Sequence, residues 1–171
     1  MKKHIVLGVM AGLFSSSLLA QTCLTGAPET SPEANFVQIA SGEVLDSTSN
    51  LVWQRCALGQ TFSGGTCSGE PNRYSWQEAL VAAQQVNDAD ARGWRVPNIK
   101  ELATLTERQC VRPAINTTAF PETPSDDFWT STPSTTDPER AWVVAFFNSS
   151  HSIKDKDRFV FVRLVRTYTE G

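Results

Sequence analysis

The chain has 171 residues, which is enough for one domain built around a single hydrophobic core. Its 15 lysine and arginine residues stand against 18 aspartate and glutamate residues, and this acidic balance argues against a general nucleic-acid-binding protein. Its longest apolar run, residues 5–14, is too short for a comfortable membrane span, so we expect no membrane span in the mature chain.

Residues 1–20 have the pattern of a secretory signal peptide. Lys2 and Lys3 form the charged start, residues 5–14 form the apolar centre, and Ala20 is the small residue before the expected cleavage. Cleavage there leaves 13 basic against 18 acidic residues, a net charge of −5. We therefore expect an exported chain, either periplasmic, cell-surface or secreted. It would begin with a proline-, threonine- and serine-rich arm at residues 21–34.

All four cysteines lie in the expected mature chain. An even number in an oxidising compartment predicts two disulfides, for which three pairings are possible. Cys56 and Cys67 flank a glycine- and serine-rich loop and form the natural local pair, which leaves Cys23 with Cys110. A zinc site is the competing interpretation, but the spacing lacks C-x-x-C and His151 is the only histidine of the mature chain. We expect no metal and no cofactor.

Two capped helices are predicted. Ser75 and Glu78 form a capping box for a helix over residues 75–87, whose apolar stripe faces the core. Pro97 disfavours helix at Val96, and Asn98 with Glu101 then forms the same motif for a second helix over residues 99–108.

Strand patterns occupy much of the remaining chain. They include a hairpin that turns at Ser41-Gly42 and strands at residues 51–54, 129–132, 141–147 and 158–168. In the last of these, Phe159, Phe161 and Val165 alternate with Val160, Val162 and Leu164, so both faces are expected to be covered. Arg163 and Arg166 interrupt this pattern, and each is expected to pair with a buried carboxylate or with backbone carbonyls.

A set of motifs between residues 35 and 168 resembles the Lcl C-terminal domain family, named for a Legionella collagen-like protein. The motifs occur in the family's order: residues 50–56 (NLVWQRC), 74–80 (YSWQEAL), 93–102 (GWRVPNIKEL), 113–116 (PAIN), 120–121 (FP), 129–132 (WTST), 141–144 (AWVV) and 162–166 (VRLVR). The resemblance implies a C-type-lectin-like α+β domain over residues 35–168, with two helices and an antiparallel sheet. It also implies an exported binding module, because the namesake's domain is associated with adhesion to sulfated glycans. No collagen-like Gly-X-Y stalk precedes the domain here, which puts the namesake's trimeric arrangement in doubt.

The candidate binding residues are Trp129, as an aromatic platform for a sugar ring, and Lys154, Lys156 and Arg158 in a loop at residues 149–158. Such residues would suit glycans or a sulfated polysaccharide, or an envelope protein. The competing interpretation is structural, with Trp129 in the core and the alternating lysines and aspartates on a solvated hairpin. A structural subunit of a surface assembly is a further alternative.

Catalysis is not expected. All cysteines can pair, which leaves no free thiol nucleophile, and His151 stands in a predicted turn without a visible triad. Glu70-Pro71-Asn72 matches a tripeptide of calcium-dependent lectins, but it precedes the first helix and no Trp-Asn-Asp follows, so we interpret it as coincidental. Asp126 and Asp127 are a faint cation signal.

Overall fold

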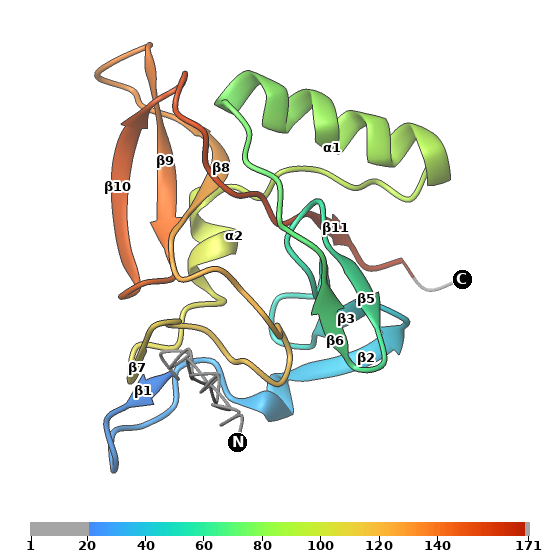
Figure 1. Ribbon diagram of the computed structural model, residues 1–171, viewed down its shortest axis with the longest axis vertical. Helices are drawn as coiled ribbons and strands as arrows, with labels where there is room; N and C mark the ends of the chain where they lie inside the picture. Colours follow the sequence, from blue (N-terminus) through green and yellow to red (C-terminus); the bar gives the residue numbers. More distant parts are fainter. Residues whose placement is uncertain (1–20, 170–171) are drawn as a thin grey trace, which may run out of the picture.

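The computed structural model describes residues 21–169, so the predicted signal peptide lies outside the described residues. The fold is α+β, as predicted (Figure 1). Its elements follow in this order: β1 (Thr22–Cys23), the 3-10 helix η1 (Glu33–Asn35), β2 (Phe36–Ala40), β3 (Glu43–Asp46), β4 (Leu51–Gln54), β5 (Thr61–Ser63), β6 (Thr66–Ser68), α1 (Trp76–Asp90), α2 (Ile99–Ala103), β7 (Cys110–Val111), β8 (Asp127–Pro133), β9 (Arg140–Ala145), β10 (Ser150–Asp155) and β11 (Val165–Thr167).

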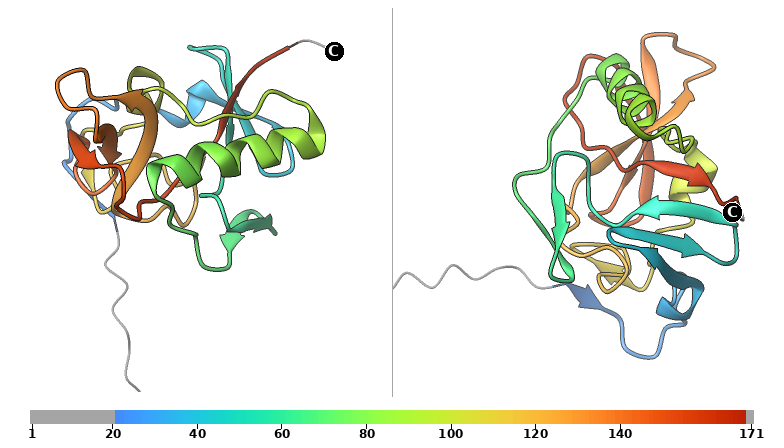
Figure 2. Two further views of the ribbon diagram at one scale, coloured as in Figure 1. Left: turned by 90° about the horizontal axis from the view of Figure 1, so that it is seen from above. Right: turned by 90° about the vertical axis from the view of Figure 1, so that its right-hand side faces the viewer.

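The larger strands form two antiparallel sheets. One has the order β11-β4-β3-β2 and the other has the order β10-β9-β8, while β1–β7 and β5–β6 are separate two-stranded pairs. Figures 1 and 2 show the three-stranded sheet on one side of the molecule and the four-stranded sheet on the other, with α1 running along both. Among the described residues, no helix has the length and the apolar character that a membrane span requires.

The core has two hydrophobic clusters, and the three-stranded sheet separates them. Val144 of β9 belongs to the cluster that contains Leu102 of α2, whereas Val143 belongs to the cluster that contains Ala79 and Ala83 of α1. Because successive side chains of a strand point to opposite faces, β9 contributes to both clusters. Strand β9 therefore has core on both of its faces, while β10 at the edge of the sheet is largely exposed.

Helix α1 begins as predicted but ends later. Ser75 caps it, and the reciprocal bonds of the capping box with Glu78 are both present. The prediction ended the helix at residue 87, whereas it continues to Asp90. There Ala91 adopts the left-handed conformation (φ 55°) and donates to the carbonyl of Asn87, which closes the last turn.

Helix α2 has the predicted capping box but is much shorter than predicted. It ends at Ala103, not at residue 108. The next three residues continue with i→i−3 hydrogen bonds, from the N–H of Thr104, Leu105 and Thr106 to the carbonyls of residues 101–103. Leu102 and Leu105 are both fully buried. The i→i−3 turns keep Leu105 on the same side of the chain as Leu102. Both leucines are therefore buried although the α-helix has ended.

The C-terminal segment is also less regular than predicted. Of residues 158–168, only β11 joins the sheet. The preceding residues make isolated bridges, Tyr74 with Val160 and Phe128 with Phe161. The predicted alternation is confirmed in the interior, since Phe161 and Val165 enter one core cluster and Val160, Val162 and Leu164 enter the other. The exception is Phe159, which is 62% exposed.

Both predicted disulfides are present, Cys56–Cys67 and Cys23–Cys110. The first joins the end of β4 to the β5–β6 hairpin, and the second joins β1 to β7. The two arginines are placed as predicted. Arg163 donates to the carbonyls of Gln54 and Arg55, and Arg166 pairs with the carboxylate of Glu43 at 2.9 Å.

Candidate binding surface beside helix α1

Trp129, the predicted sugar platform, is fully buried. Its indole N–H donates to the carbonyl of Tyr74 (2.8 Å), and its ring belongs to the core cluster under α1. A sugar ring needs an exposed aromatic face for stacking, and this indole offers none. The structure therefore corrects this assignment, and Trp129 is a core residue.

The three predicted basic residues lie on β10 and in the turn after it, and not in a long loop. Lys154 lies on β10 and pairs with Asp127 (3.3 Å). The ammonium of Lys156 donates to the carbonyl of Pro138 (2.6 Å) and lies 4.4 Å from the ring centroid of Trp76. Arg158 is exposed and has no ion pair within residues 21–169. The lysines are thus held by separate contacts, and the structure does not gather the three into one basic cluster.

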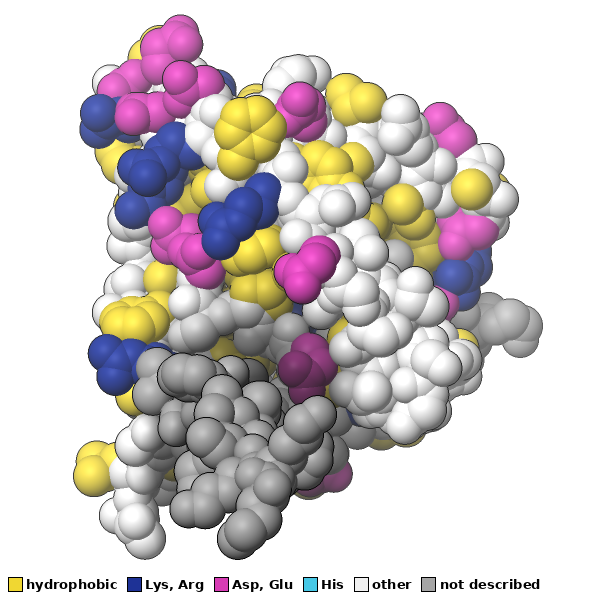
Figure 3. Space-filling model, viewed as in Figure 1, with side chains coloured by type: hydrophobic (Ala, Val, Ile, Leu, Met, Phe, Trp, Pro, Cys, Tyr) yellow, Lys and Arg dark blue, Asp and Glu magenta, His cyan; other side chains and the backbone are white. Residues whose placement is uncertain are grey.

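A groove of about 420 Å³ lies between the outward face of α1 and the segment that carries Phe159. Its floor is apolar, with Phe159 62% exposed and Val81 47% exposed beside Tyr74 and Ala82. Figure 3 shows hydrophobic side chains reaching the surface in this part of the molecule, over α1 and the segment next to it. Large apolar side chains that remain exposed together mark interaction surfaces more often than chance.

Helix periodicity and one backbone bridge position this groove. Gln77, Val81 and Gln85 are four residues apart, so they form one strip on the face of α1 opposite the buried Ala79 and Ala83. Tyr74 and Val160 exchange two backbone hydrogen bonds of 2.9 Å each, which fixes the Phe159 segment beside the start of the helix. The scaffold is therefore well defined on both sides of the groove.

The charged groups at the rim are already engaged. Arg73 pairs with Asp126 (2.8 Å) and lies 4.0 Å from the ring centroid of Phe161. Glu78 closes the capping box, and its hydrogen bonds to the backbone and side chain of Ser75 lower the pKa of its carboxyl. The groups left for a ligand are the apolar floor and the amides of Gln77 and Gln85.

Local sequence patterns do not reveal this groove, and the reason is identifiable. Phe159 fits the alternation of residues 158–168, which predicts a core position for it. Val81 carried a weak signal, because it is the one large apolar residue of α1 that stands outside the predicted core-facing stripe. The two positions come together only through the Tyr74–Val160 bridge, which no local pattern indicates.

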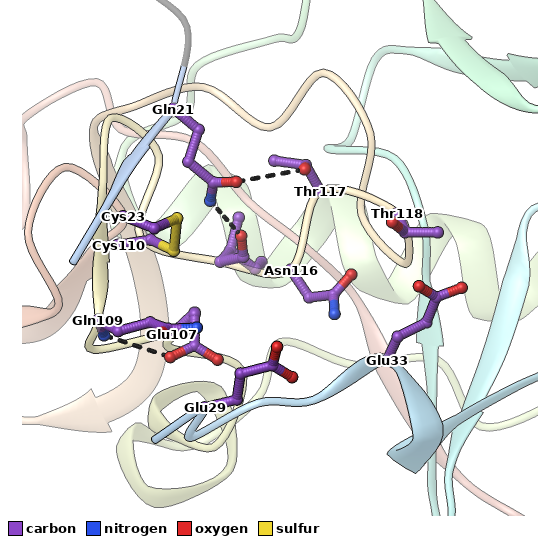
Figure 4. A pocket seen from close by; sticks show the side chains of 11 residues that line it. Gln21, Cys23, Glu29, Glu33, Glu107, Gln109, Cys110, Asn116, Thr117 and Thr118 are labelled. Atoms are coloured by element: carbon purple, nitrogen blue, oxygen red, sulfur yellow. Dashed lines mark hydrogen bonds between the residues drawn. A yellow bond between two sulfur atoms is a disulfide. The ribbon is translucent and has the colours of Figure 1, made fainter. Parts of the chain in front are cut away.

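A second hollow, of about 240 Å³, lies under the N-terminal arm (Figure 4). The carboxylate of Glu107 accepts hydrogen bonds from the backbone N–H groups of Thr30 (3.0 Å), Ser31 (2.9 Å) and Gln109 (3.2 Å). Gln21 donates to two backbone carbonyls of the facing loop. The contacts around this hollow fasten the arm to the domain.

Neither cation signal of the sequence gathers into a site. Within the described residues, no group of three or more His, Cys, Asp or Glu side chains is placed to hold a metal ion. Asp126 and Asp127 are paired with Arg73 and Lys154. Asn72 donates to the hydroxyl of Tyr74 at 3.2 Å.

The comparison with known families agrees with the resemblance seen in the motifs. The family model of the Lcl C-terminal domain matches residues 42–166, which is most of the chain. A search of curated proteins found no match. The match runs from the β2–β3 turn to the middle of β11, and it includes α1, the groove, the three-stranded sheet and the four-stranded sheet without β2. The chain therefore belongs to the Lcl C-terminal domain family.

Proposed function

We propose that this chain is a non-catalytic binding module that docks on a partner through the groove between α1 and Phe159. One observation carries the proposal. Phe159 and Val81 are two of the large apolar side chains that the described residues leave exposed, and they line the same groove. Leaving both in water gives no folding benefit, whereas covering them in a complex removes apolar area from solvent.

Several features support a binding role over catalysis. Both cysteine pairs are oxidised, so no thiol nucleophile exists in the described chain. His151 lies on the exposed strand β10, not in the predicted turn. The two disulfides are consistent with an oxidising compartment, which agrees with the proposed export. The C-type-lectin-like class, which the family resemblance implies, would also suit a binding role.

The groove chemistry favours a protein partner, such as an envelope protein. Its floor is aliphatic and aromatic, its free polar groups are neutral amides, and its charged neighbours are paired. A short peptide with an apolar anchor would bury the floor, and its backbone could bond to Gln77 and Gln85. The aromatic and aliphatic anchor residues of the partner would then determine affinity.

A glycan partner is the second candidate, and it rests on Arg158. This guanidinium is exposed and unpaired within the described part of the chain, and it stands one residue before Phe159. Adhesion to a sulfated polysaccharide would combine a salt-sensitive contact at Arg158 with stacking on Phe159. The neighbouring Asp155 and Asp157 weaken such an attraction, which is why we place it second.

A peptide library displayed on phage tests the proposal with the oxidised chain as bait. We expect enriched peptides to carry an aromatic or aliphatic anchor and to bind the Phe159→Ala variant about tenfold more weakly. Val111→Ala, another exposed apolar residue distant from α1, is the matched control and should bind as the wild type does. Equal binding of selected peptides by Phe159→Ala would refute the groove as the docking site.

A sulfated-glycan array with Arg158→Ala tests the second candidate, which predicts salt-sensitive binding that the variant loses.

A further inference from the structure

Strand β2 forms one edge of the four-stranded sheet, and its outer side is open. Within residues 21–169 it pairs with β3 alone, and the sheet ends there (Figure 1). Its five residues, FVQIA, carry no charge, and all except the first are exposed. An exposed edge strand that is uncharged and rich in apolar residues is a site at which another strand can add to the sheet.

The other outer strands of the two larger sheets are protected. At the opposite edge of the same sheet, β11 is bridged by Arg95, and in the three-stranded sheet β8 is bridged by Phe161. The remaining outer strand, β10, carries Lys154 and Asp155, and charged side chains discourage pairing with a further strand. Neither form of protection is present at β2 in the described chain. A bulge near its end, between Gln38 and Ala40, leaves residues 36–38 as the regular part of the edge.

A row of apolar side chains crosses the sheet and ends at this edge. Val52, Leu45 and Val37 stand opposite one another on β4, β3 and β2. Their exposure increases along the row, because Val52 is fully buried, Leu45 is partly buried and Val37 is 50% exposed. Ile39 is a further exposed apolar residue of the same strand. The apolar surface therefore continues beyond the part that the core covers.

The outer edge of β2 also has free backbone groups. The carbonyl of Asn35 accepts from the N–H of Ser47 at 2.9 Å, so it points toward β3. Because the direction of these groups alternates along an antiparallel strand, those of Phe36 and Gln38 point outward. The N–H of Phe36 donates to the carbonyl of Glu33. The carbonyl of Phe36 and both backbone groups of Gln38 are left without a backbone partner in the described chain.

We propose that β2 pairs antiparallel with β2 of a second copy of this chain, about a two-fold axis at Val37. In this register the N–H of Gln38 donates to the Phe36 carbonyl of the second copy, and symmetry supplies the reciprocal bond. The two Val37 side chains face each other across the axis and cover each other from solvent. This register needs only the donors and acceptors that β2 has free, and it brings no like charges of the strand together. Since the match requires no sequence other than that of β2 itself, we assign a second copy to this edge.

The pairing is short, so we expect a weak dimer with a Kd of about 100 μM. Figures 1 and 2 show β2 and α1 on different sides of the molecule, so the groove beside α1 stays open in both copies. One consequence rests on the proposed function: two grooves in one dimer bind a partner with repeated docking segments more tightly than one groove does. The pairing itself is independent of that function.

The test combines sedimentation equilibrium and amide hydrogen exchange on the oxidised, 15N-labelled chain. We expect a dimer that grows with concentration, together with slower exchange at the amide of Gln38. The amide of Val37 already faces β3, so its exchange should not depend on concentration. A chain that stays monomeric up to about 1 mM would overturn the proposal. So would a dimer in which the exchange of Gln38 does not slow.

Val37→Lys and Val81→Lys are a matched pair of variants, one on β2 and one in the groove. The two valines are 50% and 47% exposed, so both variants should fold, which circular dichroism checks. Val37→Lys places two like charges face to face at the axis and should raise the dimer Kd about tenfold or more. Val81→Lys should dimerise as the wild type does. The reverse result would place the contact at the groove and overturn the assignment to β2, and a dimer that neither variant weakens would refute it.

Discussion

Two buried charges fasten the two ends of the described chain, and neither has an ion-pair partner among residues 21–169. Arg163, in the C-terminal segment, is fully buried, and Glu107, which receives the N-terminal arm, is 4% exposed. Arg163 is surrounded by carbonyl and hydroxyl oxygens, whereas Glu107 is surrounded by backbone N–H groups. In both places main-chain dipoles replace the counter-ion, which is a recognised way to satisfy a buried charge.

Arg163 is the more completely buried of the two charges. Arg163 donates to the carbonyls of Gln54 and Arg55 and to the hydroxyl of Thr123 (2.7 Å), and its guanidinium lies 4.8 Å from the ring centroid of Phe120. Burial lowers the pKa of Arg163 to about 9, which still leaves it charged at neutral pH. Its partners are two carbonyls and a hydroxyl, so we expect its contacts to be unchanged between neutral and acidic pH.

The contacts of the Glu107 carboxylate depend on pH. Burial would raise the pKa of Glu107, but hydrogen bonds from Thr30, Ser31 and Gln109 outweigh this effect and lower the pKa below its usual value. A protonated carboxyl accepts these N–H bonds poorly. The comparison therefore distinguishes a permanent attachment of the C-terminal segment from an acid-sensitive attachment of the arm.

Arg163→Met should have the largest effect. The change leaves two buried carbonyls and the Thr123 hydroxyl without their donor, and it should lower the free energy of unfolding by about 3 kcal/mol or more. Urea denaturation followed by circular dichroism measures the loss. Arg163→Lys keeps the charge but not the planar guanidinium, so its free energy of unfolding should lie between those of the wild type and Arg163→Met. A loss below about 0.5 kcal/mol in Arg163→Met would show that the buried guanidinium is not a structural element.

Glu107→Gln should cost less, about 1–3 kcal/mol, because the neutral amide has one acceptor oxygen and presents a donor to the remaining N–H groups. The Cys23–Cys110 disulfide still tethers the arm. We therefore expect faster hydrogen exchange at the amides of Thr30 and Ser31 and little change elsewhere. Glu29→Gln, at an exposed carboxylate near the same hollow, is the control and should leave these amides protected.

Acid should produce the same local change in the wild type. Because the pKa of Glu107 is lower in the folded chain, its contribution to stability is complete above the usual glutamate pKa of about 4.3 and disappears as the pH falls through the folded value. Glu78, Asp90 and Glu101 also have lowered pKa values, so total stability falls for several reasons. The difference in free energy of unfolding between the wild type and Glu107→Gln isolates the contribution of the Glu107 charge. This difference should shrink between pH 7 and pH 3. A difference that is constant with pH would contradict the role of the Glu107 charge.

The sequence predicts local structure here better than it predicts long-range contacts. Ser75 with Glu78 and Asn98 with Glu101 identify both helix starts, since a capping box depends on four consecutive residues. The end of α2 is missed because Leu105 reaches the core through a tight turn as well as it would through a helix. Both disulfides are predictable, because Cys56 and Cys67 form a local pair and this leaves Cys23 to pair with Cys110. The contact between Glu107 and the arm spans more than 70 residues and leaves no local pattern.

The candidate site shows the same limit from the other direction. Trp129 and Phe159 were assigned by residue type and periodicity, and the structure exchanges their expected positions. The indole is inside because β8 is covered by α1, and the phenyl ring is outside because its segment leaves the sheet after β10. Periodicity cannot indicate where a segment stops being paired, and this decides which of two aromatic residues meets solvent.

The smallest effect on stability is expected at Phe159, two residues from a phenylalanine with the opposite environment. Phe159→Ala should change the free energy of unfolding by no more than about 0.5 kcal/mol, because the ring is 62% exposed. Phe161→Ala removes a ring that is 6% exposed and packs near Phe128, and it should cost about 3–5 kcal/mol. If Phe159→Ala proved as damaging as Phe161→Ala, the ring would be part of the core in solution and the groove would have no floor. A neutral result, with partner binding lost, would instead separate the two roles within one segment. Arg163 holds the segment to the domain, and Phe159 is left available for a partner because the fold does not need it.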